Sequence, residues 1–254
     1  MRRVYVALGT LVVGYLAICA LVFFVQRSLV FPAPIEKAGT PRGMIEVPVK
    51  DGTFMITSIV NDTGPVVVHF HGNGEQVGWL GFIAQEYKER GVSFVAVEYP
   101  GYPGTTGIAT EDAIMKAAEA ALKQLAVPRE RLVLEGQSVG TGVAVAMTAK
   151  GWGSKLILLS PYTALPDVGA RVFSWLPVRL LMRDRFDSLS RAGELKVPTL
   201  ITHGRRDDVV PFELGEQLSK SINGVQFVAI DDAGHNDLWD KPAVITALTS
   251  FVVP

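Results

Sequence analysis

The segment Gly136-Gln137-Ser138-Val139-Gly140 constrains the fold of this chain more than any other. An apolar run at 132–134 precedes it, and a helix-like apolar run at 143–147 follows it. The order strand, tight turn, helix, with a serine at the turn, is typical of a nucleophile elbow. The glycines permit a sharp turn and a close approach of strand and helix, so the hydroxyl of Ser138 would project from the sheet. The alternative interpretation is a glycine turn with an idle serine.

The N-terminal segment is apolar and long. Residues 4–25 carry no charge over 22 positions, which is about the length that a membrane-spanning helix needs. Arg2 and Arg3 favour a cytoplasmic N-terminus, so the rest of the chain would lie on the non-cytoplasmic side, the periplasm in a bacterium. A cleaved signal peptide is the alternative, with Cys19 in a distantly lipoprotein-like context. Because the apolar run continues past Cys19, we expect an uncleaved, single-pass signal anchor.

Composition narrows the class of protein. The chain has 254 residues, and removing the anchor leaves roughly 210 to 220, enough for one domain with a sizeable core. The net charge of −1 gives no reason to expect a nucleic-acid partner. Cys19 is the single cysteine, so neither a disulfide within the chain nor a cysteine-based metal site can form. We therefore expect no metal, and the oligomeric state stays open.

The rest of the sequence alternates between strand-like and helix-like segments. Strands are expected at 45–49, 54–60, 65–70, 92–97, 131–135, 155–159, 199–202 and 225–230. Further helices are expected at 79–90, 110–125, 212–221 and 243–252. This alternation predicts an α/β fold, a mainly parallel sheet with helices on both faces.

Irregular segments set the expected boundaries. Prolines after position 31 indicate a juxtamembrane linker beginning near Leu29, because proline discourages helix continuation. The expected organisation is an anchor and juxtamembrane turn at 1–30, a linker at 31–43 and one domain at 44–254. Residues 162–195 are broken by prolines and rich in apolar side chains, so they could form at most a small cap.

A serine needs a base to take its proton, and only four histidines are present. His69 lies within an expected strand, where a packing or hydrogen-bonding role is expected. His71 begins His71-Gly72-Asn73-Gly74, an H-G-x-G loop of the kind that donates an amide to an oxyanion hole. His203 stands at a strand end, where a structural role is equally plausible. His235 follows the last expected strand and is the predicted base.

The acid that orients the base is expected at Asp207, the fourth residue past His203, with Asp208 as the alternative. The chain order is then Ser138, Asp207, His235. This order differs from those of chymotrypsin and subtilisin, and it is the order of α/β-hydrolases.

These motifs carry a resemblance that covers the chain from about residue 44 to its end. The chain resembles serine hydrolases of the α/β-hydrolase superfamily, with the α/β-hydrolase fold. Within the superfamily it is similar to the small membrane-anchored group that includes α/β-hydrolase-domain acyl-protein depalmitoylases and bacterial relatives. The shared motifs, besides those of the triad, are Gln26-Arg27-Ser28-Leu29-Val30-Phe31-Pro32, His71-Gly72-Asn73-Gly74-Glu75, Tyr99-Pro100-Gly101-Tyr102, Ser160-Pro161-Tyr162-Thr163 and Asp184-Arg185-Phe186-Asp187-Ser188.

The resemblance implies hydrolysis of carboxylic esters or thioesters through an acyl-enzyme. The apolar side chains of residues 162–195 and the anchor favour lipid-like or acylated substrates at a membrane, and the alternative is that these side chains only close the core. Backbone amides of Val139 and Asn73 would hold the oxyanion, and no cofactor is implied. The alternatives are a non-catalytic, membrane-tethered binding module on the same scaffold and a serine peptidase of the same fold. Because no catalytic element is expected before Ala38, a chain starting there should be soluble and active. Acyl length, head group and substrate-binding residues stay open.

Overall fold

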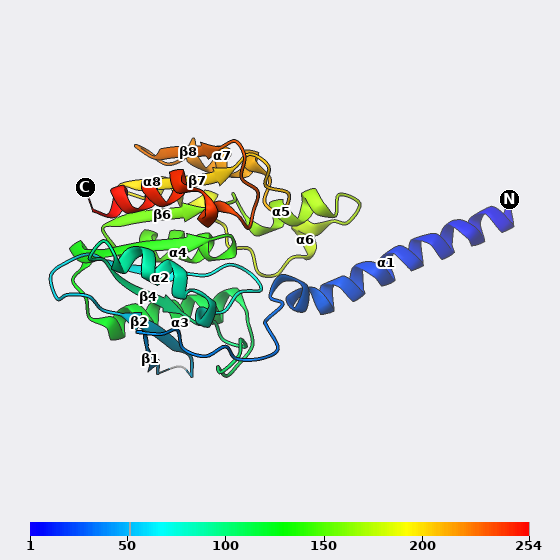
Figure 1. The fold of residues 1–254 in the computed structure, drawn as a ribbon. Coiled ribbons are helices and arrows are strands. Elements are labelled where there is room, and N and C mark those ends of the chain that lie inside the picture. Colours follow the sequence, from blue (N-terminus) through cyan, green and yellow to red (C-terminus); the bar gives the residue numbers. More distant parts are fainter. Residues whose placement is uncertain (51, 254) are drawn as a thin grey trace.

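The computed structural model describes residues 1–50 and 52–253, so Asp51 and Pro254 of the expected domain lie outside the described residues. Within this part of the chain, eight strands form one sheet in the order β1-β2-β4-β3-β5-β6-β7-β8 (Figure 1). Strands β3 to β8 are parallel, and β1 and β2 join antiparallel at one edge. The strands are β1 Ile45–Pro48, β2 Phe54–Ser58, β3 Val66–Phe70, β4 Ser93–Val97, β5 Leu132–Gln137, β6 Lys155–Leu159, β7 Thr199–Gly204 and β8 Gln226–Ile230.

All eight expected strands are present, and the predicted mainly parallel α/β sheet is confirmed. Strand ends differ where the backbone finds other partners. β2 ends at Ser58 instead of Val60, because the amide of Val60 donates to the side chain of Ser93 at 3.0 Å. β5 runs on to Gln137, which pairs with Leu159 of β6, so the strand leads directly to Ser138.

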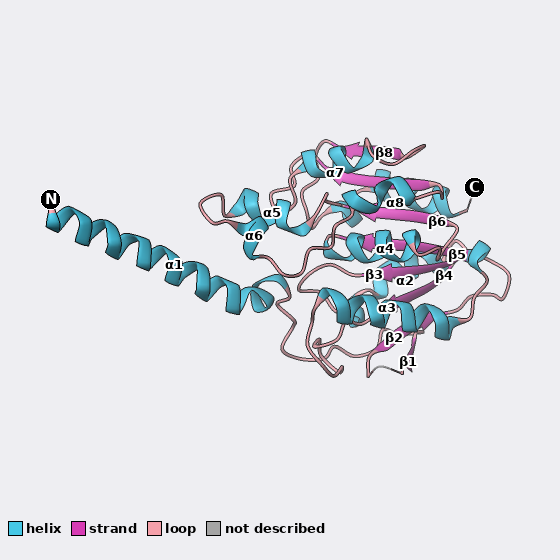
Figure 2. Cartoon of the chain, turned by 180° about the vertical axis from the view of Figure 1, so that it is seen from behind, coloured by secondary structure: helices cyan, strands magenta, loops and turns pink. Residues whose placement is uncertain are grey.

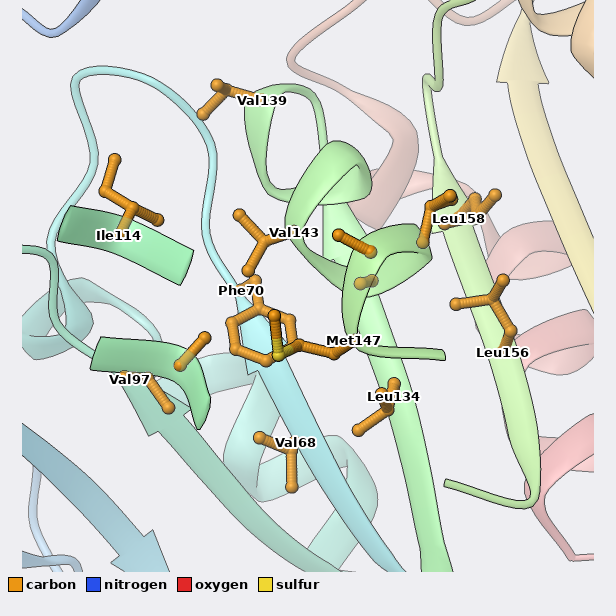
Figure 3. Packing of buried hydrophobic residues seen from close by; sticks show 14 of the residues in the cluster. Val68, Phe70, Val97, Ile114, Leu134, Val139, Val143, Met147, Leu156 and Leu158 are labelled. Carbon is orange, nitrogen blue, oxygen red and sulfur yellow. The ribbon is translucent and has the colours of Figure 1, made fainter. Parts of the chain in front are cut away.

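Helices cover both faces of the sheet. On one face, α3 (Glu111–Leu125), α4 (Val139–Ala149) and α7 (Phe212–Ser219) contribute to one buried cluster. Figure 3 shows part of it, with Val143 and Met147 of α4 beside Phe70 of β3. On the other face, α2 (Gly81–Lys88) and α8 (Pro242–Val252) pack on a second cluster. The two layers shield the parallel strands, whose side chains are mainly apolar on both faces.

A small cap lies beside the end of the sheet at which the parallel strands finish (Figures 1 and 2). It consists of α5 (Leu165–Val172) and α6 (Val178–Leu181), joined by a short loop. The cap falls within the irregular segment 162–195, as expected. The cap projects from the same side of the domain as the N-terminal helix (Figure 1).

The N-terminal helix α1 (Arg2–Val30) is longer than the apolar run (Figure 1). The expectation that a linker begins near Leu29 is wrong, because the helix continues through Val30 and ends at Phe31, just before Pro32. Phe31 is buried, with its ring centroid 6.1 Å from that of Phe186. The end of α1 is thus packed into the domain.

Candidate active site

Ser138 occupies a strained turn between β5 and α4. Its backbone has φ 51° and ψ −121°, a conformation that residues with a side chain rarely adopt. The amide of Ser138 donates to the carbonyl of Leu159 at 2.9 Å, which fixes the turn. A side chain at Gly140 would collide with the carbonyl oxygen of Phe70, and one at Gly136 with the backbone of Gly140. Both glycines are therefore required by the close approach of strand and helix.

The structure brings the three residues predicted as nucleophile, base and acid together. His235 Nε2 lies 3.0 Å from Ser138 Oγ, and His235 Nδ1 lies 2.8 Å from Asp207 Oδ2. Each of the three residues follows a parallel strand, so the carboxyl ends of β5, β7 and β8 place them at one edge of the sheet. Ser138 and His235 are each 8% exposed. Asp208, the alternative acid, is exposed, and the carboxylate facing His235 belongs to Asp207.

Asp207 is held as an anion. Burial opposes its ionisation, but hydrogen bonds from His203 and His235, and from the backbone amide of Val210, outweigh burial and hold the pKa of the carboxyl well below its usual value. Its Oδ1 accepts the amides of Val209 and Val210 at 3.0 and 2.7 Å. The carboxylate can therefore fix His235 with Nδ1 protonated and Nε2 facing the serine.

The predicted oxyanion loop lies next to Ser138. Gly72, Asn73 and Val139 line the same cavity as Ser138 and His235. The amide of Gly72 donates to Glu75 Oε2 at 2.6 Å, so that donor is already used. Val139 is the first residue of α4, and its amide has no partner within the helix. Asn73 and Val139, the predicted oxyanion donors, therefore line the same cavity as Ser138.

A buried pair of side chains, His71 and Glu98, lies against this loop. His71 Nδ1 faces the carbonyl of Gly72 at 2.8 Å, and Nε2 faces Glu98 Oε1 at 2.9 Å. Glu98 also accepts the amides of Val77 and Tyr99, each at 3.0 Å. Burial lowers the pKa of His71, but the Glu98 carboxylate outweighs burial and raises it above the usual value. Because both ring nitrogens face acceptors, His71 can donate to both only in its protonated form.

His69 lies away from Ser138, on the opposite face of the sheet. Its Nδ1 lies 2.7 Å from Glu135 Oε1, and Tyr87 donates its hydroxyl to the other oxygen of that carboxylate. All three side chains are buried with the second cluster, against Phe94. This placement fits the packing role expected of His69.

An apolar cavity of about 410 Å³ opens beside Ser138. The cap supplies much of its wall, including Val172, Phe173, Leu176 and Met182. The N-terminal helix supplies more of it: Val22, Gln26, Leu29 and Val30. All three residues of the predicted triad follow Ala38, as expected, but the wall of the cavity extends to residues before it, because α1 packs against the cap.

Sequence reasoning missed several residues that surround the predicted triad. His203 was assigned no contact with the site, yet its Nε2 lies 3.2 Å from Asp207 Oδ2. The spacing of His203 and Asp207, four residues apart across a turn, was the available signal. For Glu98, which contacts His71, the only sequence signal was a carboxylate directly after a buried strand. For Gln26, the signal was a polar residue directly after an apolar run.

Comparisons with known proteins agree with this fold. The family model described as alpha/beta hydrolase fold matches residues 179–242. An uncharacterized protein of Mycobacterium tuberculosis, Rv2307c, is 30% identical over 246 residues, covering 89% of this chain and 87% of that protein. The alpha/beta hydrolase L404 of Acanthamoeba polyphaga mimivirus is 30% identical over 184 residues, covering 69% of this chain and 68% of its own length.

Two further relatives connect sequence and structure. Human alpha/beta hydrolase domain-containing protein 17B is 28% identical over 188 residues, covering 72% of this chain and 64% of that protein. An esterase from Exiguobacterium antarcticum superposes with a TM-score of 0.66 at 21% identity, covering 82% of this chain and 99% of that one. By these sequence relationships and by its eight-stranded sheet, this chain belongs to the α/β-hydrolase family.

Proposed function

We propose that this protein is a serine hydrolase that cleaves carboxylic esters or thioesters through an acyl-enzyme. The observation that carries the proposal is the hydrogen-bonded row from Ser138 through His235 to Asp207, with 3.0 and 2.8 Å between successive side chains. This arrangement is what a serine needs to become a nucleophile near neutral pH. Its position at the mouth of an apolar cavity supports an acyl group as the part of the substrate that is bound.

In the first half of the reaction, Ser138 Oγ attacks the carbonyl carbon and its proton passes to His235 Nε2. The carbonyl oxygen becomes an oxyanion, which accepts hydrogen bonds from the amides of Asn73 and Val139. Each such donor contributes about 3 kcal/mol to stabilising the transition state. The intermediate collapses when the bond to the leaving oxygen or sulfur breaks, and that atom takes the proton from His235. The acyl group stays on Ser138.

In the second half, His235 takes a proton from water, and the resulting hydroxide adds to the acyl carbon. Collapse of this second intermediate returns the proton to Ser138 Oγ and releases a carboxylic acid. Asp207 stays ionised throughout and stabilises the positive charge that His235 carries in each half. The two half-reactions balance without any cofactor.

The cavity supports medium or long acyl chains as substrates. Its wall is mainly Val, Leu, Phe and Met side chains from the cap and from α1. Each methylene buried against such a wall contributes roughly 0.8 kcal/mol. Lipid-like esters or acylated molecules at a membrane are therefore the substrate class that fits this site best.

The N-terminal helix supports the membrane as the place of action. Residues Arg3–Val30 have a mean hydropathy of 2.5 over their most apolar window, and only 6% of that window is buried against the protein. The helix is therefore long and apolar enough to cross a bilayer, and its apolar side chains are free to face lipid. We propose a single-pass anchor that keeps the hydrolase domain on the non-cytoplasmic side.

A serine-directed fluorophosphonate probe tests this function directly. The full chain in detergent micelles should be labelled on Ser138, as located by peptide mass spectrometry, and should hydrolyse nitrophenyl esters. Ser138→Ala should show neither property. A wild-type chain that takes no label and turns over no ester would instead be the non-catalytic binding module. Cleavage of peptide amides faster than of esters would favour the peptidase.

A further inference from the structure

The N-terminal helix presents one face to the catalytic cavity. Val22, Gln26 and Val30 recur at intervals of four residues and line the cavity together with Leu29. Residues at this spacing lie one above another on the same side of a helix. Leu21, one position before Val22, points elsewhere and is 62% exposed. The anchor therefore has a cavity side and a side that is free to face lipid.

Polar contacts fix this helix to the cap. Gln26 is buried, donates to the carbonyl of Leu181 at 3.1 Å and accepts the amide of Arg183 at 2.8 Å. Arg27 Nε lies 3.1 Å from Asp184 Oδ2. The other oxygen of Asp184 accepts the amide of Glu111 at the start of α3, at 2.8 Å. The last turns of α1 are thus part of the hydrolase domain, which a simple tether would not require.

A second contact ties the cap to a point far along the helix. The hydroxyl of Tyr15 donates to the carbonyl of Trp175 in the loop between α5 and α6, at 3.0 Å. Tyr15 precedes Val25, the last residue of the apolar run, by ten positions, or about 15 Å of helix. That length is about half of the hydrocarbon core of a bilayer. If residues 4–25 cross the membrane, the tip of the cap lies within one leaflet.

The surface of the cap suits such a position. Val172, Phe173, Trp175 and Leu180 are exposed although they are large and apolar. Of the cap's charges, Arg179 pairs with Asp167 at 2.8 Å and the guanidinium of Arg183 lies over the ring of Phe23, while Arg171 of α5 is exposed. Trp175 and Phe173 can lie among acyl chains while the arginine head groups reach the interface.

We propose that α1 forms one wall of the acyl-binding cavity, and that the acyl chain enters from the leaflet between α1 and the cap. The proposal rests on the proposed acyl hydrolysis and adds a path and a specificity-determining helix to it. The chain would come from an ester or thioester held in the bilayer. Val22 would determine acyl length, because it is the wall residue of α1 that lies deepest along the helix toward the membrane.

The test uses the full chain in phosphatidylcholine nanodiscs. We compare Val22→Trp, which fills the cavity wall, with Leu21→Trp, which adds the same side chain to the exposed side. The readout is the ratio of kcat/KM for methylumbelliferyl palmitate to that for methylumbelliferyl acetate. Val22→Trp should lower this ratio at least about tenfold, because the lost space is space for methylenes. Leu21→Trp should leave it within about twofold of wild type. An unchanged ratio in Val22→Trp would overturn the proposal.

A measurement without turnover separates this proposal from the proposed function. Palmitic acid with a photoreactive diazirine at mid-chain is placed in the nanodisc and irradiated. Labelling of Gln137, Ser138 and Val139 is scored, because these three buried residues line the cavity. The proposal is supported if these residues are labelled in wild type and in Leu21→Trp but not in Val22→Trp. This result would count even if no ester is hydrolysed. Label confined to outward-facing positions of α1 and the cap contradicts it.

The carrier of the acyl chain is identified in the same nanodiscs. Palmitate release is measured from dipalmitoyl phosphatidylcholine and from a bilayer-bound S-palmitoyl peptide. Release from either carrier that falls in Val22→Trp but not in Leu21→Trp supports entry from the leaflet. Release that both variants leave unchanged contradicts it.

Discussion

His203 and His235 share one oxygen of the same carboxylate: Nε2 of His203 and Nδ1 of His235 lie 3.2 and 2.8 Å from Asp207 Oδ2. His203 Nε2 also faces the carbonyl of Val210 at 3.0 Å, and a carbonyl can only accept, so this nitrogen carries a proton. His235 then donates from Nδ1, which leaves Nε2 free to accept the proton of Ser138. The second histidine therefore fixes the charge and position of the acid.

Ser138→Ala and His235→Ala should each lower kcat for nitrophenyl esters by about four to six orders of magnitude, since the three residues act as a unit. Ser138→Ala removes only a hydroxyl, so the thermal unfolding midpoint of that variant should stay near that of wild type. Calorimetry on the same samples supplies that control. Substantial esterase activity in Ser138→Ala would remove the serine from its assigned role.

Asp207→Asn should lower kcat by about 10³- to 10⁴-fold, because an amide can hold His235 in the wrong tautomer and carries no charge to stabilise its cation. Asp208→Asn is the matched control, since Asp208 is the exposed neighbour, and it should stay within about twofold of wild type. Steady-state kinetics on both variants decides between the two aspartates. A greater loss in Asp208→Asn would require the acid to be reassigned.

His71 should make stability depend on pH. The Glu98 carboxylate outweighs burial and raises the pKa of His71 in the folded protein above its usual value of about 6.5. A raised pKa stabilises the fold fully below about pH 6.5, and that contribution is lost as pH rises through the folded pKa. The free energy of unfolding of wild type relative to His71→Gln should therefore be largest near pH 6 and decline at higher pH. Chemical denaturation from pH 5.5 to 9 measures it, and a difference that is constant or grows with pH contradicts the ion pair.

The anchor gives a fourth prediction. The full chain should sediment with membranes and resist extraction by alkaline carbonate, because most of the apolar side chains of residues 4–25 are removed from water only when the helix lies in lipid. A chain starting near Ala38 should be released from membranes but should lose activity toward long acyl esters, since it lacks the cavity wall made by Val22, Gln26, Leu29 and Val30. Mass spectrometry of the mature N-terminus supplies the control. A terminus at or after Cys19 would establish cleavage instead of an anchor.

Local patterns predicted the sheet because each strand is a short apolar run bounded by turn residues, as at Val66–Phe70. They also predicted which loops would meet, because strands of one parallel sheet end at one edge. Contacts that depend on how distant segments pack were not predictable in this way. Gln26 and the backbone of Leu181 and Arg183 are separated by more than 150 residues, and their pairing leaves no periodic signal. The role of α1 as a wall of the cavity was not predictable either. An apolar residue such as Val22 suits contact with lipid and contact with a cavity equally well, so the sequence does not distinguish the two.

Gly140 provides the sharpest test of the elbow's packing. A Cβ at this position would collide with the backbone carbonyl oxygen of Phe70 and would also approach that of His71 at 2.7 Å. Neither neighbour is a flexible side-chain end, so β3 and α4 would have to separate. Gly140→Ala should therefore lower the free energy of unfolding by about 3 kcal/mol, the upper end of the usual cost of overpacking. It should also lower kcat, because α4 carries the amide of Val139.

Gly193→Ala is the control: a Cβ at Gly193 meets no atom within 4 Å, so this variant should unfold and react like wild type. Urea denaturation of both variants measures the difference, and equal stability of the two would mean that strand and helix are not in the close contact seen at Ser138.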